Sequence, residues 1–249
     1  GEPAASTLEQ RASGPHTVAW ARAQGWTGTT GEELADSYRA GEDVAVAAVA
    51  RSAHAVGVGL TSAATLLGTM AGLAIHRYRM RWMMPVVITP VAMPEILLGV
   101  SLLIFFVSVF GPTSLGLTSV IIAHTAFCIG FVAVIVRARL SGMDESVFEA
   151  ARDLGATPWQ TFRLVTLPLI LPAVIAGFLM SFTLSIDDFV ITFFTAGVGV
   201  KTLPLTIYSM IKIAVTPEVN AISALLLAVT LAMIIAASRL APDALRARS

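Results

Sequence analysis

The chain has 249 residues, of which 56% are hydrophobic and only 13% charged, and its mean hydropathy is +0.80. Soluble domains typically carry about 25% charged residues, so this composition excludes an ordinary soluble domain. The formal net charge of zero argues against nucleic-acid recognition through bulk charge, and the single cysteine, Cys128, which we expect to be buried, excludes an internal disulfide.

The first segment, residues 1–52, is polar and weakly patterned, and only 33–50 has helical spacing. Because its apolar content is mostly alanine and valine, we predict a loosely ordered polar flank outside the bilayer rather than a binding module. The chain opens with Gly-Glu-Pro, without an initiator methionine or the apolar core of a signal peptide. We therefore expect an altered or truncated start.

Five stretches are long and apolar enough to cross a membrane, which takes about 20 residues in a helix. This pattern predicts an all-α polytopic membrane protein with five transmembrane helices. The stretches are about 53–75, 83–110, 116–136, 168–187 and 219–238. Small residues that permit close helix packing recur at Gly68 and Gly72 in the first stretch, and at Gly177, Ser181 and Ser185 in the fourth.

The second stretch contains three prolines, Pro85, Pro90 and Pro94, and one acid, Glu95. Proline removes a backbone donor and breaks a helix, which is tolerated in a membrane where the freed groups line a cavity. A carboxylate at this depth is costly unless it faces a cavity or the bundle interior. We predict a broken helix at which Glu95 either borders a translocation path or is hydrogen-bonded to a neighbouring helix.

Basic residues follow every second stretch, which orients the chain, because cytoplasmic loops are enriched in arginine and lysine. This pattern places 76–82, 137–167 and the C-terminus in the cytoplasm, and 1–52 outside. The arginines concerned are Arg77, Arg79, Arg81, Arg137, Arg139, Arg239, Arg246 and Arg248.

A long polar interruption between the third and fourth stretches has the pattern of two short helices around a glycine. Gly155 stands where a left-handed helix C-cap is expected. Thr157-Pro158-Trp159-Gln160 follows as a capping box with proline at the first helical position. We therefore predict a helix-turn-helix with an apolar face on the cytoplasmic membrane surface, attached directly to the fourth stretch, where a partner docks.

This segment resembles the signature of binding-protein-dependent ABC importer permeases: Glu-Ala-Ala, three residues, Gly, nine residues, an aliphatic residue, one residue, then Leu-Pro. The resemblance implies that the segment seats in a cleft of a cytoplasmic ATPase and couples ATP hydrolysis to transport. The positions that match the signature are Glu149, Ala150, Ala151, Gly155, Val165, Leu167 and Pro168.

The resemblance also implies the domain organisation. Members usually have six spans, so the first is expected to be missing here. The extracytoplasmic segment would be 1–52 and the transmembrane domain 53–240, with the coupling loop at 140–167 and a cytoplasmic tail at 241–249.

Two adjacent acids, Asp187 and Asp188, end the fourth stretch at its outer side, where they could attract a cationic solute, contact a binding protein, or simply be solvated. The strings from Asp187 to Thr195 and from Pro94 to Val100 resemble the second permease subunit of spermidine/putrescine importers. Because polyamines are polycations, carboxylates such as Glu95, Asp187 and Asp188 would suit their path.

The sequence contains no phosphate-binding loop, and its four histidines are dispersed without metal-ligand spacing, so we predict neither a catalytic nor a metal site. His124 within the third stretch is expected to be a hydrogen-bonded packing residue. No cofactor is expected on this chain, because ATP and Mg²⁺ would be bound by the partner ATPase.

The resemblance implies a second permease subunit, a cytoplasmic ATPase dimer, an extracytoplasmic solute-binding protein and the lipid bilayer as partners, with the chain in a bacterial cytoplasmic membrane. Three alternatives stay open: an importer for another small solute such as an opine, a phosphonate or ferric ion; a membrane-embedded hydrolase; and a membrane scaffold.

Overall fold

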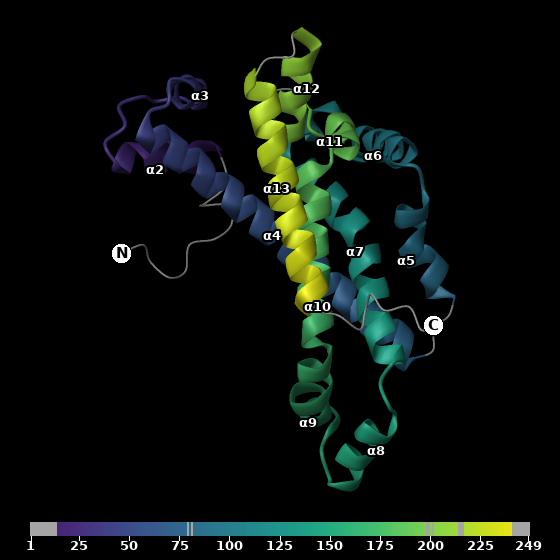
Figure 1. Ribbon diagram of the computed structural model, residues 1–249. Helices are drawn as coiled ribbons and strands as arrows, with labels where there is room; N and C mark the ends of the chain where they lie inside the picture. Colours follow the sequence, from purple (N-terminus) through teal and green to yellow (C-terminus); the bar gives the residue numbers. More distant parts are fainter. Residues whose placement is uncertain are drawn as a thin grey trace. The chain divides into compact units, whose positions relative to one another are not determined.

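The computed structural model describes residues 14–78, 80, 82–197, 200, 202–213 and 217–240. Every regular element in these ranges is helical, as the all-α prediction requires (Figure 1). The chain divides into two compact units, Gly1–Leu60 and Thr61–Ser249, and the boundary lies inside helix α4 (Asp43–Arg77).

The described part of the first unit is a small packed group of helices, so the prediction of a loosely ordered flank is wrong. Helices α2 (Gly14–Ala23) and α3 (Gly31–Arg39) precede α4. The indole of Trp26 is buried in their core and donates a hydrogen bond to Ser37 Oγ across 3.0 Å. Alanine and valine supply most of the remaining core, so the apolar pattern is weak although the packing is close.

Three helices of the described chain are long and apolar enough to cross a membrane: Gly57–Arg77, Leu117–Ser141 (helix α7) and the continuous Pro158–Asp187. They coincide with the first, third and fourth predicted stretches. The fifth stretch forms α13 (Pro217–Leu240), which contains the apolar segment Ser223–Ile235.

The second predicted stretch is broken, as the prolines indicated. Helix α5 (Met83–Ala92) and helix α6 (Glu95–Phe110) meet at an angle of 106°. Met93 between them is extended, with ψ at 143°, because the ring of Pro94 disfavours the helical conformation of the preceding residue. The bent pair has the length and composition of either one broken span, which would be the fourth, or a re-entrant loop.

Helix α7 is the centre of the second unit. Its Val132 is fully buried, and glycines from two other helices lie against it. A Cβ added to Gly68 of α4 would lie 2.5 Å from Val132 Cβ, and one added to Gly177 would lie 3.1 Å from Val132 Cγ1. The predicted close packing through small residues is therefore confirmed at both positions.

Candidate functional site

The polar element between the third and fourth spans begins with α8 (Ser146–Asp153) and α9 (Pro158–Thr161). A π-helical turn, η2 (Phe162–Thr166), then leads into α10 (Leu167–Asp187). Figure 1 shows α8 and α9 at the end of α10 that lies away from α11 (Val190–Thr195). The element is therefore accessible at one end of the membrane unit.

The turn after α8 is a Schellman motif centred on Gly155. The amide of Ala156 donates to the carbonyl of Ala151 across 3.1 Å, and the amide of Gly155 donates to the carbonyl of Arg152 across 2.8 Å. Gly155 has a φ of +79°, in the left-handed region that favours glycine. The predicted glycine cap is confirmed.

The second short helix begins with the predicted capping box. Thr157 Oγ1 accepts the amide of Gln160 across 3.3 Å, and Gln160 Oε1 accepts the amide of Thr157 across 2.8 Å. Asp144 lies just before α8, and its Oδ1 accepts the amide of Ser146 across 3.0 Å. This hydrogen bond holds the Asp144 pKa below its usual value.

The second short helix runs through Pro168 into the fourth span, as the predicted direct attachment requires. Pro158–Asp187 is one continuous helix of 30 residues. Pro168 lacks the amide hydrogen that a regular helix would direct at Leu164, and the amide of Leu167 instead bonds the carbonyl of Phe162, five residues back. The π turn therefore accommodates the proline without separating α9 from α10.

The outer side of the element carries exposed apolar residues. Val147, Ala150 and Leu154 share one face of α8, and Leu154 is 88% exposed. Trp159 at the start of α9 and Leu164 in the π turn are 66% and 70% exposed. An isolated apolar residue on a surface is unremarkable, but a group on one short element indicates a contact surface.

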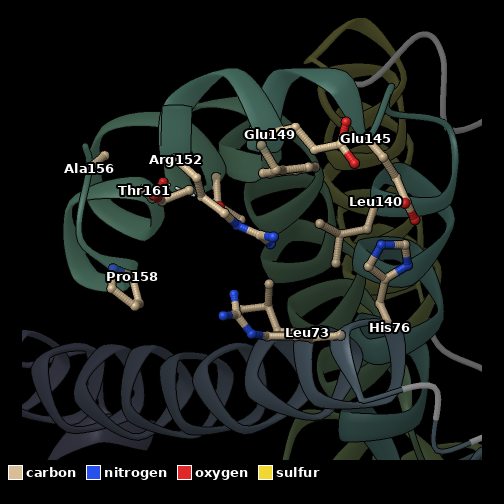
Figure 2. A pocket seen from close by; sticks show the side chains of 12 residues that line it. Leu73, His76, Leu140, Glu145, Glu149, Arg152, Ala156, Pro158 and Thr161 are labelled. Carbon is tan, nitrogen blue, oxygen red and sulfur yellow. Dashed lines mark hydrogen bonds between the residues drawn. The ribbon is translucent and has the colours of Figure 1, made fainter. Parts of the chain in front are cut away.

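The inner side of the element lines a cavity of about 620 Å³. Figure 2 shows Arg152 of α8 reaching into this cavity, with Leu73 and His76 of α4 on the opposite wall. The cavity is bordered by charged groups of both signs, and its ionisable residues are His76, Arg77, Glu145, Glu149 and Arg152.

The residues of the predicted signature are divided between these two sides. Glu149 lines the cavity, Ala151 is buried, and Ala150 and Gly155 are exposed. The remaining signature residues, Val165, Leu167 and Pro168, lie where the element joins the span. Val165 and Leu167 are half-buried, and Pro168 is exposed.

Glu95 lies at the break between α5 and α6. It is the first residue of α6, and its side chain is exposed. One turn later, Gly99 contacts α11, since a Cβ there would lie 2.7 Å from Phe194 Cδ2.

The two acids at the end of α10 have different environments. Asp187 is exposed, so it is open to a solute, a binding protein or water, as expected. The Asp188 side chain is only 5% exposed, so the same expectation is wrong for Asp188. Its Oδ2 accepts the amide of Thr192 across 2.9 Å, so the carboxylate caps α11.

His124 of α7 completes this buried polar group. Its Nε2 lies 3.3 Å from Asp188 Oδ2 and 2.8 Å from Thr192 Oγ1, and its Nδ1 lies 3.0 Å from Ser185 Oγ. The predicted hydrogen-bonded role of His124 is confirmed. Thr192 had no sequence signal beyond being polar in an apolar segment.

No group of three or more histidine, cysteine, aspartate or glutamate side chains is arranged to hold a metal ion in the described part of the chain.

Comparison with known proteins identifies relatives over most of the chain. A family model described as "Binding-protein-dependent transport system inner membrane component" matches residues 64–246. The spermidine/putrescine transport system permease protein PotC of Escherichia coli (strain K12) is 42% identical over 183 residues, which are 72% of this chain and 69% of that protein.

The putrescine transport system permease protein PotI of the same strain is 41% identical over 187 residues, covering 70% of this chain and 66% of that protein. Among solved structures, a chain of the MetNI methionine ABC transporter in an inward-facing conformation has a TM-score of 0.61 at 23% identity. The match covers 77% of this chain and 94% of that one, and it shows that the fold is shared.

Proposed function

The chain belongs to the family of binding-protein-dependent transport system inner membrane components, and on this premise we propose that it is a permease subunit of a polyamine ABC importer. In this proposal it carries spermidine or putrescine across a bacterial cytoplasmic membrane by ATP-driven alternating access. The observation that carries the proposal is the capped element 144–167, which has an exposed apolar face and continues without a break into a membrane span.

The proposed mechanism begins at this exposed face. A cytoplasmic ATPase dimer binds the surface that includes Val147, Leu154 and Trp159, while ATP and Mg²⁺ remain on the ATPase. When the ATPase closes, α8 moves as a unit with α9, because the Schellman turn and the capping box satisfy the backbone groups between them. The cavity beneath α8 provides space for that movement.

The movement then passes into the bundle through α10. The helix is continuous from Pro158, so a displacement of α9 tilts or shifts the span rather than being lost in a loop. Helix α10 also packs on α7, where Arg139 Nε donates to the carbonyl of Leu169 across 3.2 Å. This hydrogen bond links the start of α10 to the end of α7, so a displacement of α10 also displaces α7.

The solute class follows from charge and from the named relatives. A polycation loses hydration when it enters the membrane, and the exposed carboxylates of Glu95 and Asp187 would balance its positive charge there. The relatives named above transport spermidine and putrescine. A second permease would complete the path, and an extracytoplasmic binding protein would deliver the solute.

The experiment that tests this proposal is uptake by the chain reconstituted with its second permease and ATPase in proteoliposomes, with loaded binding protein outside. We expect ATP-dependent accumulation of radiolabelled spermidine or putrescine, and none when the ATPase cannot hydrolyse ATP. Uptake of an opine, a phosphonate or ferric ion in place of polyamines would assign another solute. ATPase binding without any uptake would support a scaffold, and turnover of a substrate by the isolated chain would support a hydrolase.

A further inference from the structure

The cavity beneath α8 is bordered by charged side chains that have no partner of opposite charge. Its volume of about 620 Å³ lies within the range of small-molecule sites. Two elements supply its ionisable lining: α8 and the residue before it contribute Glu145, Glu149 and Arg152, and the last turn of α4 contributes His76 and Arg77. Among the residues that the structure describes, no ion pair joins any of these five groups to another residue.

A buried hydroxyl in the wall of the same cavity also lacks a partner. Thr161 of α9 lines the cavity and is only 6% exposed, yet its Oγ1 has no hydrogen-bond partner in the described part of the chain. A buried hydroxyl without a partner costs free energy, which a ligand that bonds it would recover. Figure 2 shows Thr161 and Arg152 toward one end of the cavity, and Glu145 and His76 toward the other.

The cavity lies where two membrane spans end. The candidate spans Gly57–Arg77 and Leu117–Ser141 finish at its border, and Leu73 and Leu140 line it from their last turns. Span ends mark the edge of the hydrocarbon core, beyond which lie the polar headgroups of the lipids. The cavity is therefore at the depth of the headgroup layer, and its apolar walls continue into the spans.

Lining groups of both signs fit a headgroup that itself carries both charges. A purely anionic headgroup would be repelled by Glu145 and Glu149, and a lone cation would be repelled by Arg152. A guanidinium binds phosphate through parallel hydrogen bonds, and a carboxylate accepts hydrogen bonds from a primary ammonium. The trimethylammonium of phosphatidylcholine has no N–H to donate, so the primary ammonium of phosphatidylethanolamine fits better.

We propose that this cavity binds a phospholipid headgroup with a phosphate and a primary ammonium, as in phosphatidylethanolamine. Arg152 and the hydroxyl of Thr161 donate to the phosphate, and the carboxylates of Glu145 and Glu149 accept from the ammonium. The site does not depend on which solute is carried. In the proposed mechanism α8 moves into this cavity, so a bound headgroup stabilises the arrangement seen here and leaves when α8 moves. The competing explanation is that water alone solvates these charges.

The test is native mass spectrometry of the full-length chain in mixed micelles that hold equal amounts of phosphatidylethanolamine, phosphatidylcholine and phosphatidylglycerol. We expect the wild type to retain phosphatidylethanolamine about fivefold over either other lipid. Arg152→Gln should abolish this preference. Glu145→Gln should reduce the preference over phosphatidylcholine. Thr161→Val, which keeps the side-chain volume but removes the hydroxyl, should lower retention by about threefold or more.

Arg163→Gln and Asp153→Asn are the matched controls, because both residues are exposed on the same element but do not line the cavity. They should retain lipid like the wild type. Arg152 and Glu145 are exposed, so their variants test binding even if Thr161→Val alters packing. Equal retention of the three lipids by the wild type overturns the inference, as does a preference for phosphatidylglycerol. Wild-type retention by all the cavity variants would place the lipid elsewhere and also overturn it.

A second probe separates a lipid from a soluble ligand of the same chemistry. O-phosphoethanolamine carries the same phosphate and primary ammonium without acyl chains, and we expect it to bind the wild type at least about tenfold more weakly than the lipid. Binding as tight as that of the lipid would assign the cavity to a soluble zwitterion and would overturn the lipid proposal.

Discussion

His124 Nε2 lies 3.3 Å from Asp188 Oδ2, across 64 residues of sequence, and both side chains are almost fully buried. The contact joins α7 to the junction of α10 and α11. With Thr192 and Ser185 it forms a polar group inside the membrane unit in which both imidazole nitrogens have partners. A polar group of this kind stabilises one arrangement of its helices, because any slip would leave buried polar atoms unpaired.

The first prediction concerns the loss of one partner of this contact. Asp188→Ala would leave the amide of Thr192 without its acceptor and remove one of the two partners of His124 Nε2, and we expect the unfolding free energy to fall by about 3 kcal/mol. Thermal unfolding of the detergent-purified chain measures this change. Asp187→Ala, one residue away but exposed, should unfold like the wild type. Equal unfolding temperatures for the two variants would show that the buried contact contributes nothing.

The second prediction concerns the close approach of α4 to α7. A Cβ at Gly68 would lie 2.5 Å from Val132 Cβ and 2.9 Å from the carbonyl oxygen of Ile129, closer than real Cβ atoms approach. We expect Gly68→Ala to destabilise the membrane unit by about 1–3 kcal/mol. Gly142→Ala is the control, because its Cβ would meet nothing closer than 3.6 Å. Similar thermal stability of both variants would contradict the packing described here.

The third prediction concerns the start of α9. Thr157→Ala removes the acceptor for the Gln160 amide, so the first turn should lose about 1 kcal/mol of local stability. Hydrogen exchange of the amides at 158–161 should therefore quicken severalfold. Thr157→Ser keeps a hydroxyl acceptor and should exchange like the wild type. The cap would have no role if the alanine variant exchanged as slowly as the serine variant.

Local chemistry allowed the coupling element to be predicted from sequence. The glycine at 155 and the capping box at 157–160 depend on contacts within five residues, and both are present as expected. The break before Glu95 was also predictable, because Pro94 acts on the residue next to it. The angle of 106° was not, since it depends on what α5 and α6 pack against.

Features that depend on contacts between residues far apart in the sequence could not be predicted. His124 and Asp188 were each visible as polar residues in or beside an apolar stretch, but no spacing rule joins positions 64 residues apart. Asp188 was therefore grouped with its exposed neighbour Asp187. The first unit was missed for a different reason: alanine contributes little to an apolar pattern, although Ala21, Ala45 and Ala48 are buried in its core.

The fourth prediction addresses force transmission directly. Gly155 has a left-handed φ of +79° and free space around it, so conformation rather than volume limits substitution there. Gly155→Val would disfavour the turn by roughly 1–2 kcal/mol or more, because a β-branched residue is strained in this region. Asparagine adopts left-handed φ more readily, which makes Gly155→Asn the matched variant with added bulk but a retained turn.

The most direct measurement is the number of polyamine molecules imported per ATP hydrolysed by the reconstituted complex. We predict that Gly155→Val inserts normally and supports ATP hydrolysis, but that its import per ATP falls about tenfold, while Gly155→Asn keeps most of the wild-type ratio. A Gly155→Val complex that imports as many molecules per ATP as the wild type would contradict the coupling role of this element.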